Sequence, residues 1–142
     1  MPAASQQEAA APARAGGWLL VLCRLLIVFH PLSLAVTASG VMNALALRGL
    51  PVAIVLFLRL AVVTFGVAAG RMLQQMRPGA VAIARVALLA SAAVDVFVYT
   101  TPYFPSNRLP GDTLYYVIAS LAYHFGLIAY LARSKRVRAT FA

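Results

Sequence analysis

Long apolar stretches alternate with short polar segments along most of the chain. Between Trp18 and Ala132 the apolar residues form four blocks, separated by segments rich in proline, glycine or arginine. At 1.5 Å per residue, a helix of about twenty residues crosses the roughly 30 Å hydrocarbon core of a bilayer. The pattern therefore predicts membrane-spanning helices at about residues 18–38, 51–73, 80–101 and 113–132.

Proline and glycine mark the predicted helix ends. Pro51 suits a first helical turn, where its missing N–H is not needed, and Arg77-Pro78-Gly79 predicts a turn. Pro102 ends the third span, and Asp112 is a candidate N-cap for the fourth. The outer end of the first span is the least defined boundary, because the apolar pattern continues to Leu47.

Composition decides between lipid and water as the surroundings of these helices. Apolar residues make up 63% of the chain and charged residues 11%, against about 45–50% and about 25% in soluble domains. A soluble four-helix bundle would need a charged stripe along every helix. The four blocks contain only five charged residues, namely Arg24, Arg59, Arg71, Arg85 and Asp95. We therefore expect an all-α polytopic membrane protein whose four helices form an up-down bundle.

The residues at and beyond the ends of the spans predict the domain organisation and the orientation. Residues 1–16 have no apolar period and are expected to form a disordered tail, residues 17–132 the membrane domain, and residues 133–142 a basic tail. A small-residue run at 35–38 leaves signal-peptide cleavage open as an alternative. Basic residues on the side of the termini are Arg14, Arg71, Arg77, Arg133, Lys135, Arg136 and Arg138, against Arg48 and Arg108 on the other. The positive-inside rule then places both termini in the cytoplasm.

A net charge of +9 does not indicate nucleic acid, because the basic residues stand singly or at the ends of apolar blocks. The expected partners are the lipid bilayer and anionic lipids at the cytoplasmic face, with a membrane protein or a second copy as further candidates. Cys23 is the only cysteine, so it cannot form an intramolecular disulfide and is expected to serve packing.

Both ends of the membrane region carry specific motifs. Gly16-Gly17-Trp18-Leu19 opens the first span, and residues 130–141 read Y-L-A-R-S-K-R-V-R-A-T-F. The chain resembles the YdgK-like family of small four-span bacterial inner-membrane proteins, a domain of unknown function, whose closing pattern is similar. That family commonly has an acidic residue in the second span, where this chain has Arg59. The resemblance implies a bacterial inner membrane and no particular activity.

The closing motif has two interpretations. It is either a stop-transfer anchor or a docking site for a partner or a specific anionic lipid. The candidate contact residues are Arg133, Ser134, Lys135, Arg136, Arg138 and Phe141.

Two charged residues lie deep inside predicted spans. Arg59 is about 12 Å and Asp95 about 10 Å from the outer ends of their helices, so their depths match. An unpaired charge at this depth costs at least about 2.5–3.5 kcal/mol, which predicts that the two pair inside the bundle. Arg59 shares a face with Gly66 and Gly70, a G-x-x-x-G pattern typical of helix packing. The pair is either a clamp between helices or the wall of a polar cavity.

Two histidines, His30 and His124, lie at a similar depth on the first and fourth spans. Each is either a hydrogen-bonded core residue or part of a proton or small-solute path with Arg59 and Asp95. Haem ligation and a transition-metal site with Asp95 are further alternatives without a supporting motif. We therefore expect no metal and no cofactor.

The interior offers no nucleophile beside a base and no carboxylate pair, so no enzymatic activity is expected. The first functional hypothesis is a non-enzymatic accessory or scaffold protein of the inner membrane, acting through its spans and basic tail. The alternative is a small transporter or ion-coupled channel subunit that uses the His30, Arg59, Asp95 and His124 cluster. A haem- or metal-binding membrane protein is a distant third.

Overall fold

The computed structural model describes residues 17–102 and 111–141, apart from the side chains of Asn43 and Ala44. The expectations on residues 1–16, on Arg108 and on the rest of 103–110 fall outside this range. The described regular structure is helical, with the elements α1 Trp18–Arg24, η1 Leu25–Phe29, α2 His30–Arg48, α3 Leu50–Gln74, α4 Ala80–Thr100, α5 Thr113–Arg133 and α6 Lys135–Phe141. Within it, four helices are long and apolar enough to cross a membrane.

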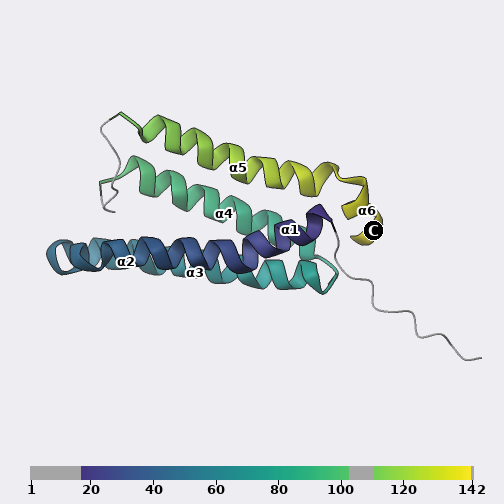
Figure 1. Ribbon diagram of the computed structural model, residues 1–142, viewed down its shortest axis with the longest axis horizontal. Helices are drawn as coiled ribbons and strands as arrows, with labels where there is room; N and C mark the ends of the chain where they lie inside the picture. Colours follow the sequence, from purple (N-terminus) through teal and green to yellow (C-terminus); the bar gives the residue numbers. More distant parts are fainter. Residues whose placement is uncertain (1–16, 103–110, 142) are drawn as a thin grey trace, which may run out of the picture.

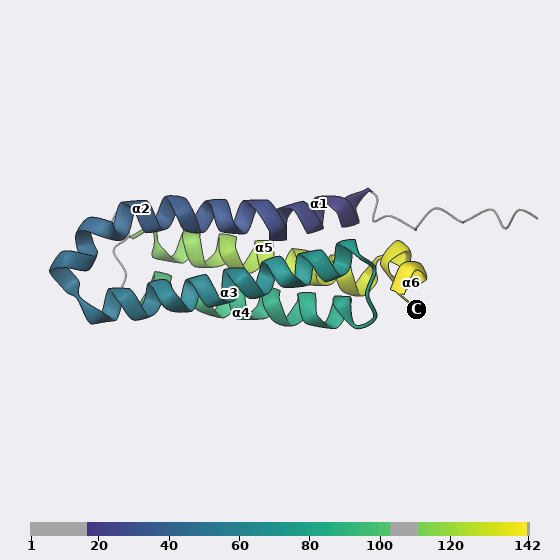
Figure 2. The same cartoon turned by 90° about the horizontal axis from the view of Figure 1, so that it is seen from below.

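The long helices lie side by side (Figures 1 and 2). The segment η1 is a single π-helical stretch, so α1, η1 and α2 form one continuous rod. This rod packs against α3, α3 packs against α4, and α4 packs against α5. The start of α1 and the short helix α6 lie at the same end of the molecule (Figure 1).

The first rod is longer than the predicted span at 18–38, because its helix continues to Arg48. Ser39 lies within the helix, where its hydroxyl donates to the Val36 carbonyl, and Val41 is buried against the neighbouring helices. The chain turns instead at Gly49, whose φ of 63° places it in the left-handed region that glycine adopts without strain. Helix α3 then begins at Leu50, with proline in its first turn as the sequence predicts.

A Schellman-type cap ends α3. The Arg77 N–H donates to the Met72 carbonyl at 3.0 Å, and the Met76 N–H donates to the Leu73 carbonyl at 3.1 Å. Met76 occupies the position that glycine usually takes, with a φ of 53°. At the other predicted cap, Asp112 precedes α5 but makes no side-chain capping bond within the described chain.

The core has two parts. The larger cluster lies toward α6 and joins the start of the first rod to α3, α4 and α5 through Leu19, Leu22, Cys23, Leu26, Ala69, Leu73, Ala80, Ala84, Ala87, Leu88, Leu131 and Val137. The smaller cluster joins α2, α3 and α4 near their opposite ends through Val41, Val52, Val55, Val94 and Val98. Polar side chains lie between the two clusters.

The segment expected as a basic tail forms α6. Ser134 is the N-cap of α6, because its hydroxyl accepts a hydrogen bond from the Val137 N–H at 3.4 Å. Val137 is buried and Phe141 packs on the larger cluster, so α6 is held against the bundle. Lys135, Arg136 and Arg138 remain exposed.

Candidate functional site

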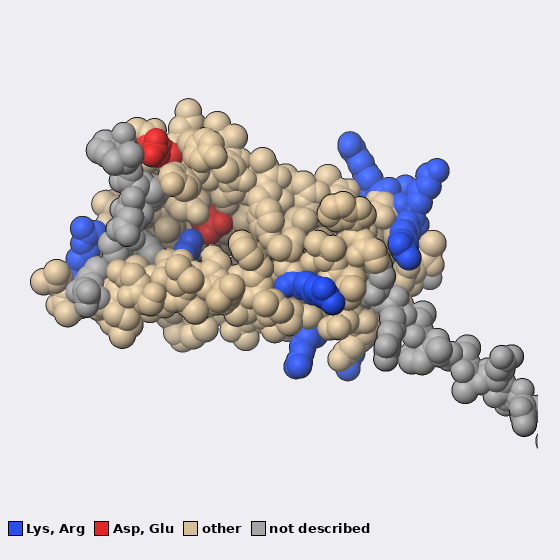
Figure 3. Space-filling view, viewed as in Figure 1, with Lys and Arg blue, Asp and Glu red and all other residues tan. Residues whose placement is uncertain are grey.

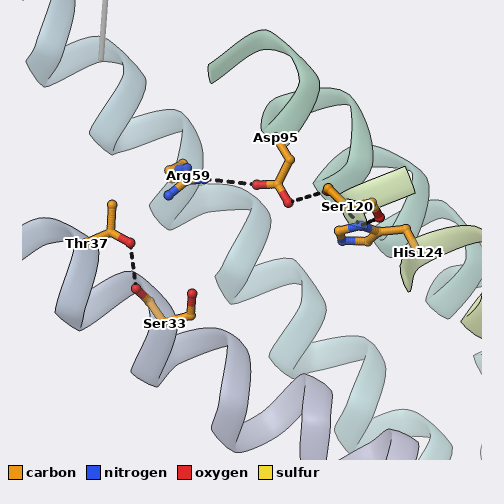
Figure 4. Close-up of polar contacts among 6 residues, drawn as sticks. All are labelled: Ser33, Thr37, Arg59, Asp95, Ser120 and His124. Atoms are coloured by element: carbon orange, nitrogen blue, oxygen red, sulfur yellow. Dashed lines mark hydrogen bonds and ion pairs between the residues drawn. The ribbon is translucent and has the colours of Figure 1, made fainter. Parts of the chain in front are cut away.

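An ion pair connects α3 and α4 inside the bundle. Arg59 Nη2 donates to Asp95 Oδ1 at 2.9 Å, and the two side chains are only 14% and 25% exposed. This confirms the pairing that their matched depths predict. Figure 4 shows the Asp95 carboxylate between Arg59 on one side and Ser120 on the other.

Ser120 links this ion pair to His124 on α5. The Ser120 hydroxyl donates to Asp95 Oδ2 at 2.8 Å, so Asp95 accepts bonds from two neighbouring helices. One turn further, His124 Nδ1 lies 2.8 Å from the Ser120 carbonyl, which only a protonated Nδ1 satisfies. The hydrogen-bond geometry thus assigns a proton to Nδ1 of His124.

His30 reaches the same region from the first rod. It follows directly on the π-helical stretch Leu25–Phe29 and precedes Pro31. Pro31 lacks an N–H and crowds the carbonyl one turn back, which a wider π turn accommodates. The helix is thereby rotated at His30, whose Nδ1 lies 3.5 Å from the position that a Cβ on Gly66 would occupy. At this distance the imidazole is in ordinary van der Waals contact with α3.

Three rings meet where the first rod faces α5. The ring centroids of His30 and His124 are 6.2 Å apart, those of His30 and Tyr123 6.4 Å, and those of Tyr123 and His124 5.0 Å. The Tyr123 hydroxyl is buried and has no hydrogen-bond partner within the described chain. The structure thus brings His30, Arg59, Asp95 and His124 together, as the sequence predicts, and adds Ser120 and Tyr123.

These side chains line a cavity of about 340 Å³ between the helices. That volume is within the range of small-molecule sites, about 300–1,000 Å³. Figure 3 shows a red and a blue side chain close together within a hollow of this face. The lining consists of Phe29, His30, Ser33, Leu34, Arg59, Val62, Val63, Ser91, Val94, Asp95, Tyr99, Tyr116, Ala119, Ser120, Tyr123 and His124.

The cluster predicted from the sequence includes neither Ser120 nor Tyr123. The spacing of Ser120 from His124, one helical turn, is the signal that could have found it. Tyr123 has no such signal, because a tyrosine beside a histidine in an apolar helix is equally consistent with packing.

The two histidines do not fit a haem in this arrangement. A porphyrin would lie between the two imidazoles, perpendicular to the line that joins them. The Tyr123 ring is 5.0 Å from the His124 ring and 6.4 Å from the His30 ring, so it lies beside the two imidazoles, where the edge of a porphyrin would be. Among the described residues, no three His, Cys, Asp or Glu side chains are grouped so as to hold a metal ion.

The remaining predicted residues lie outside the cavity. Gly66 and Gly70 are buried against the first rod, so the G-x-x-x-G face packs within the molecule. Arg85 donates to the Leu131 carbonyl near the end of α5. Arg138 caps the same helix end through the Arg133 carbonyl.

Comparison with protein-family models, curated proteins and solved structures found no match for this chain. The resemblance to the YdgK-like family therefore stays a prediction from the two ends of the membrane region. What the structure itself provides is four helices suited to crossing a membrane and a polar cavity among them.

Proposed function

We propose that the protein is a non-enzymatic multi-pass protein of the bacterial inner membrane, with both termini in the cytoplasm, and that it is a small transporter or ion-coupled channel subunit. The observation that supports this role is the cavity, whose wall includes His30, Arg59, Asp95 and His124 from all four spans. Ionisable side chains inside a membrane are costly and commonly mark substrate or ion pathways.

The open space beside the ion pair distinguishes this role from a purely structural clamp. A clamp would gain most from close packing around the paired charges, since protein interiors are normally packed without voids larger than a water molecule. Here Arg59 and Asp95 border about 340 Å³ of open volume. Serine and histidine groups face the same space, which suits a solute that exchanges hydrogen bonds with them.

The cavity lies on the outer side of the proposed bundle. It extends from His30 and His124 in the middle of the spans to Tyr99 and Tyr116 near the ends of α4 and α5. The opposite half is closed by the larger core cluster, including Leu22, Leu26 and Leu88. In this state the cavity of the proposed transporter is on the outer side of the membrane. Passage of a solute would require the inner half of the bundle to open, or several copies of the chain to form a pore together.

Cysteine labelling tests whether the cavity holds water. In a Cys23→Ala background, Ser33→Cys places a thiol on the cavity wall, because Ser33 lines the cavity and is exposed. A membrane-impermeant maleimide added to the outside of intact cells is expected to label this thiol. A thiol reacts as the hydrated thiolate, so a thiol in lipid should react far more slowly.

Thr64→Cys in the same background is the matched control. Thr64 is exposed at a similar depth on α3 but lies outside the cavity. We expect the thiol of Ser33→Cys to be labelled at least about tenfold faster than that of Thr64→Cys, because the hydrated thiolate is the reacting species. Equal and slow labelling of both thiols would show a dry site and would refute the transporter role.

An accessory or scaffold role is the second candidate, and the C-terminal helix favours it. Helix α6 is fixed by Ser134 and Val137 while its basic side chains stay exposed, which suits contact with anionic lipids or a partner. The two roles differ in what they require. Filling the cavity with Ala119→Trp should abolish a transport phenotype and leave a scaffold phenotype intact.

A further inference from the structure

The mouth of the cavity opens between the first rod and α5, at the depth of the lipid tails. On the first rod, Phe29 is 53% exposed and Ser33 is exposed; on α5, Tyr116 is 38% exposed and Ala119 is exposed. All four line the cavity. Phe29 is about 16 Å along the helix from Trp18, well inside the hydrocarbon region of a span. A molecule dissolved in the bilayer can therefore enter sideways.

The charges in the cavity balance each other. Arg59 and Asp95 are bound to one another at 2.9 Å, and Ser120 donates to the second carboxylate oxygen. A charged ligand would face no free countercharge in this pair. A neutral ligand leaves the pair intact, so the electrostatics favour a neutral molecule.

The ring side chains of the lining favour a flat ligand, and one buried hydrogen-bond donor favours a ligand with an acceptor group. The lining includes six rings, those of Phe29, His30, Tyr99, Tyr116, Tyr123 and His124. Such walls favour a flat ring, which they contact through stacked or edge-on geometry. The Tyr123 hydroxyl is buried and without an acceptor in the described chain. An acceptor such as a ring carbonyl would remove the free-energy cost of that unpaired donor.

We propose that the cavity binds the ring of a membrane-soluble quinone, which enters from the lipid between α2 and α5 and accepts a hydrogen bond from Tyr123. The proposal rests on the proposed function and names the ligand class of the same cavity. A saturated acyl chain would leave the Tyr123 hydroxyl unpaired, and a charged solute would disturb the Arg59–Asp95 pair.

Equilibrium binding of radiolabelled decylubiquinone to the full chain in lipid nanodiscs tests this. Wild type is expected to bind the probe saturably. Ala119→Trp should abolish binding, because Ala119 lines the mouth, whereas Ile118→Trp should bind within about twofold of wild type, because Ile118 is exposed and does not line the cavity. Tyr123→Phe keeps the ring and loses the donor, so the affinity should fall about tenfold.

Decanol, which has the same tail without the ring, is the competitor that separates a quinone from an acyl chain. We expect an equimolar amount to displace little of the probe. If Ala119→Trp does not fold, Tyr123→Phe still tests the site. We expect its melting temperature to equal that of wild type, so that a loss of affinity reports the missing hydroxyl and not unfolding. Lack of saturable binding, equal displacement by decanol, or wild-type affinity in Tyr123→Phe would each overturn the proposal.

The two proposals fail separately. If decylubiquinone does not bind and the Ser33→Cys thiol is labelled by the impermeant reagent, the quinone is refuted and the water-accessible pathway stands. If decylubiquinone binds as expected and the Ser33→Cys thiol is not labelled, the quinone site stands and the transporter role fails.

Discussion

At the scale of single residues, the Asp95 carboxylate holds the site together. It accepts from Arg59 on α3 and from Ser120 on α5, so three helices meet at one side chain. Bonds to ionised groups are roughly twice as strong as neutral ones, and the surrounding apolar medium strengthens them further. Each partner also becomes expensive to remove, because the remaining charge would be left in a poorly solvated place.

A charge-reversal pair tests this contact. Arg59→Asp puts two carboxylates beside each other and should lower the stability by at least about 2.5–3.5 kcal/mol, the cost of an unpaired charge at this depth. Arg59→Asp combined with Asp95→Arg restores opposite charges and should recover most of the loss. Thermal unfolding of the detergent-solubilised protein and its level in membranes are the measurements. A double variant as unstable as Arg59→Asp alone would show that the two residues do not stabilise each other.

At the scale of helices, small residues set how closely α3 approaches the first rod. A Cβ on Gly70 would lie 2.9 Å from Leu26 Cβ and 2.9 Å from Ile27 Cγ1, which is closer than carbon atoms can pack. A Cβ on Gly66 would have no neighbour, apart from its own helix backbone, closer than 3.5 Å. The close approach is therefore at Gly70, which packs against Leu26 and Ile27 of the π-helical stretch that precedes His30.

Gly70→Ala should force the two helices apart and destabilise the protein by about 1–3 kcal/mol. Gly126→Ala is the matched control, because Gly126 lies in a span and its added Cβ would meet nothing within 4 Å. Since alanine favours helix, that control should be neutral or stabilising by up to about 1 kcal/mol. Equal melting temperatures for the two variants would contradict the close packing at Gly70.

At the scale of the whole molecule, the two ends of the bundle differ. The end that holds α1 and α6 is closely packed, and Figure 3 shows most of the Lys and Arg side chains on it. The polar cavity is nearer the other end. There Arg48, at the end of α2, donates to the carbonyl of Pro102, which follows α4. One end is thus closely packed and basic, whereas the polar cavity lies toward the other end.

This asymmetry leads to a prediction for the orientation. Positive charge at the α6 end should keep that end in the cytoplasm. Green fluorescent protein fused after Ala142 should therefore fluoresce, and alkaline phosphatase at the same position should be inactive, since it folds only after export. An N-terminal fluorescent fusion should behave like the C-terminal one. An active phosphatase fusion would reverse the proposed orientation.

The sequence determined the four apolar helices and the pairing of Arg59 with Asp95. Both follow from the solvent, because lipid offers no partner to a backbone amide or to a charge, so the chain must supply its own. These features need only length, hydropathy and depth, which can be counted along the chain.

Only the tertiary structure decided how the polar groups are arranged. In lipid the outer and inner faces of a helix are both apolar, so hydrophobic periodicity does not reveal which face is inward. The positions of Ser120 beside Asp95 and of Tyr123 beside His30 therefore depend on contacts between helices. The open space beside the ion pair also depends on how four helices fit together, which no single span specifies.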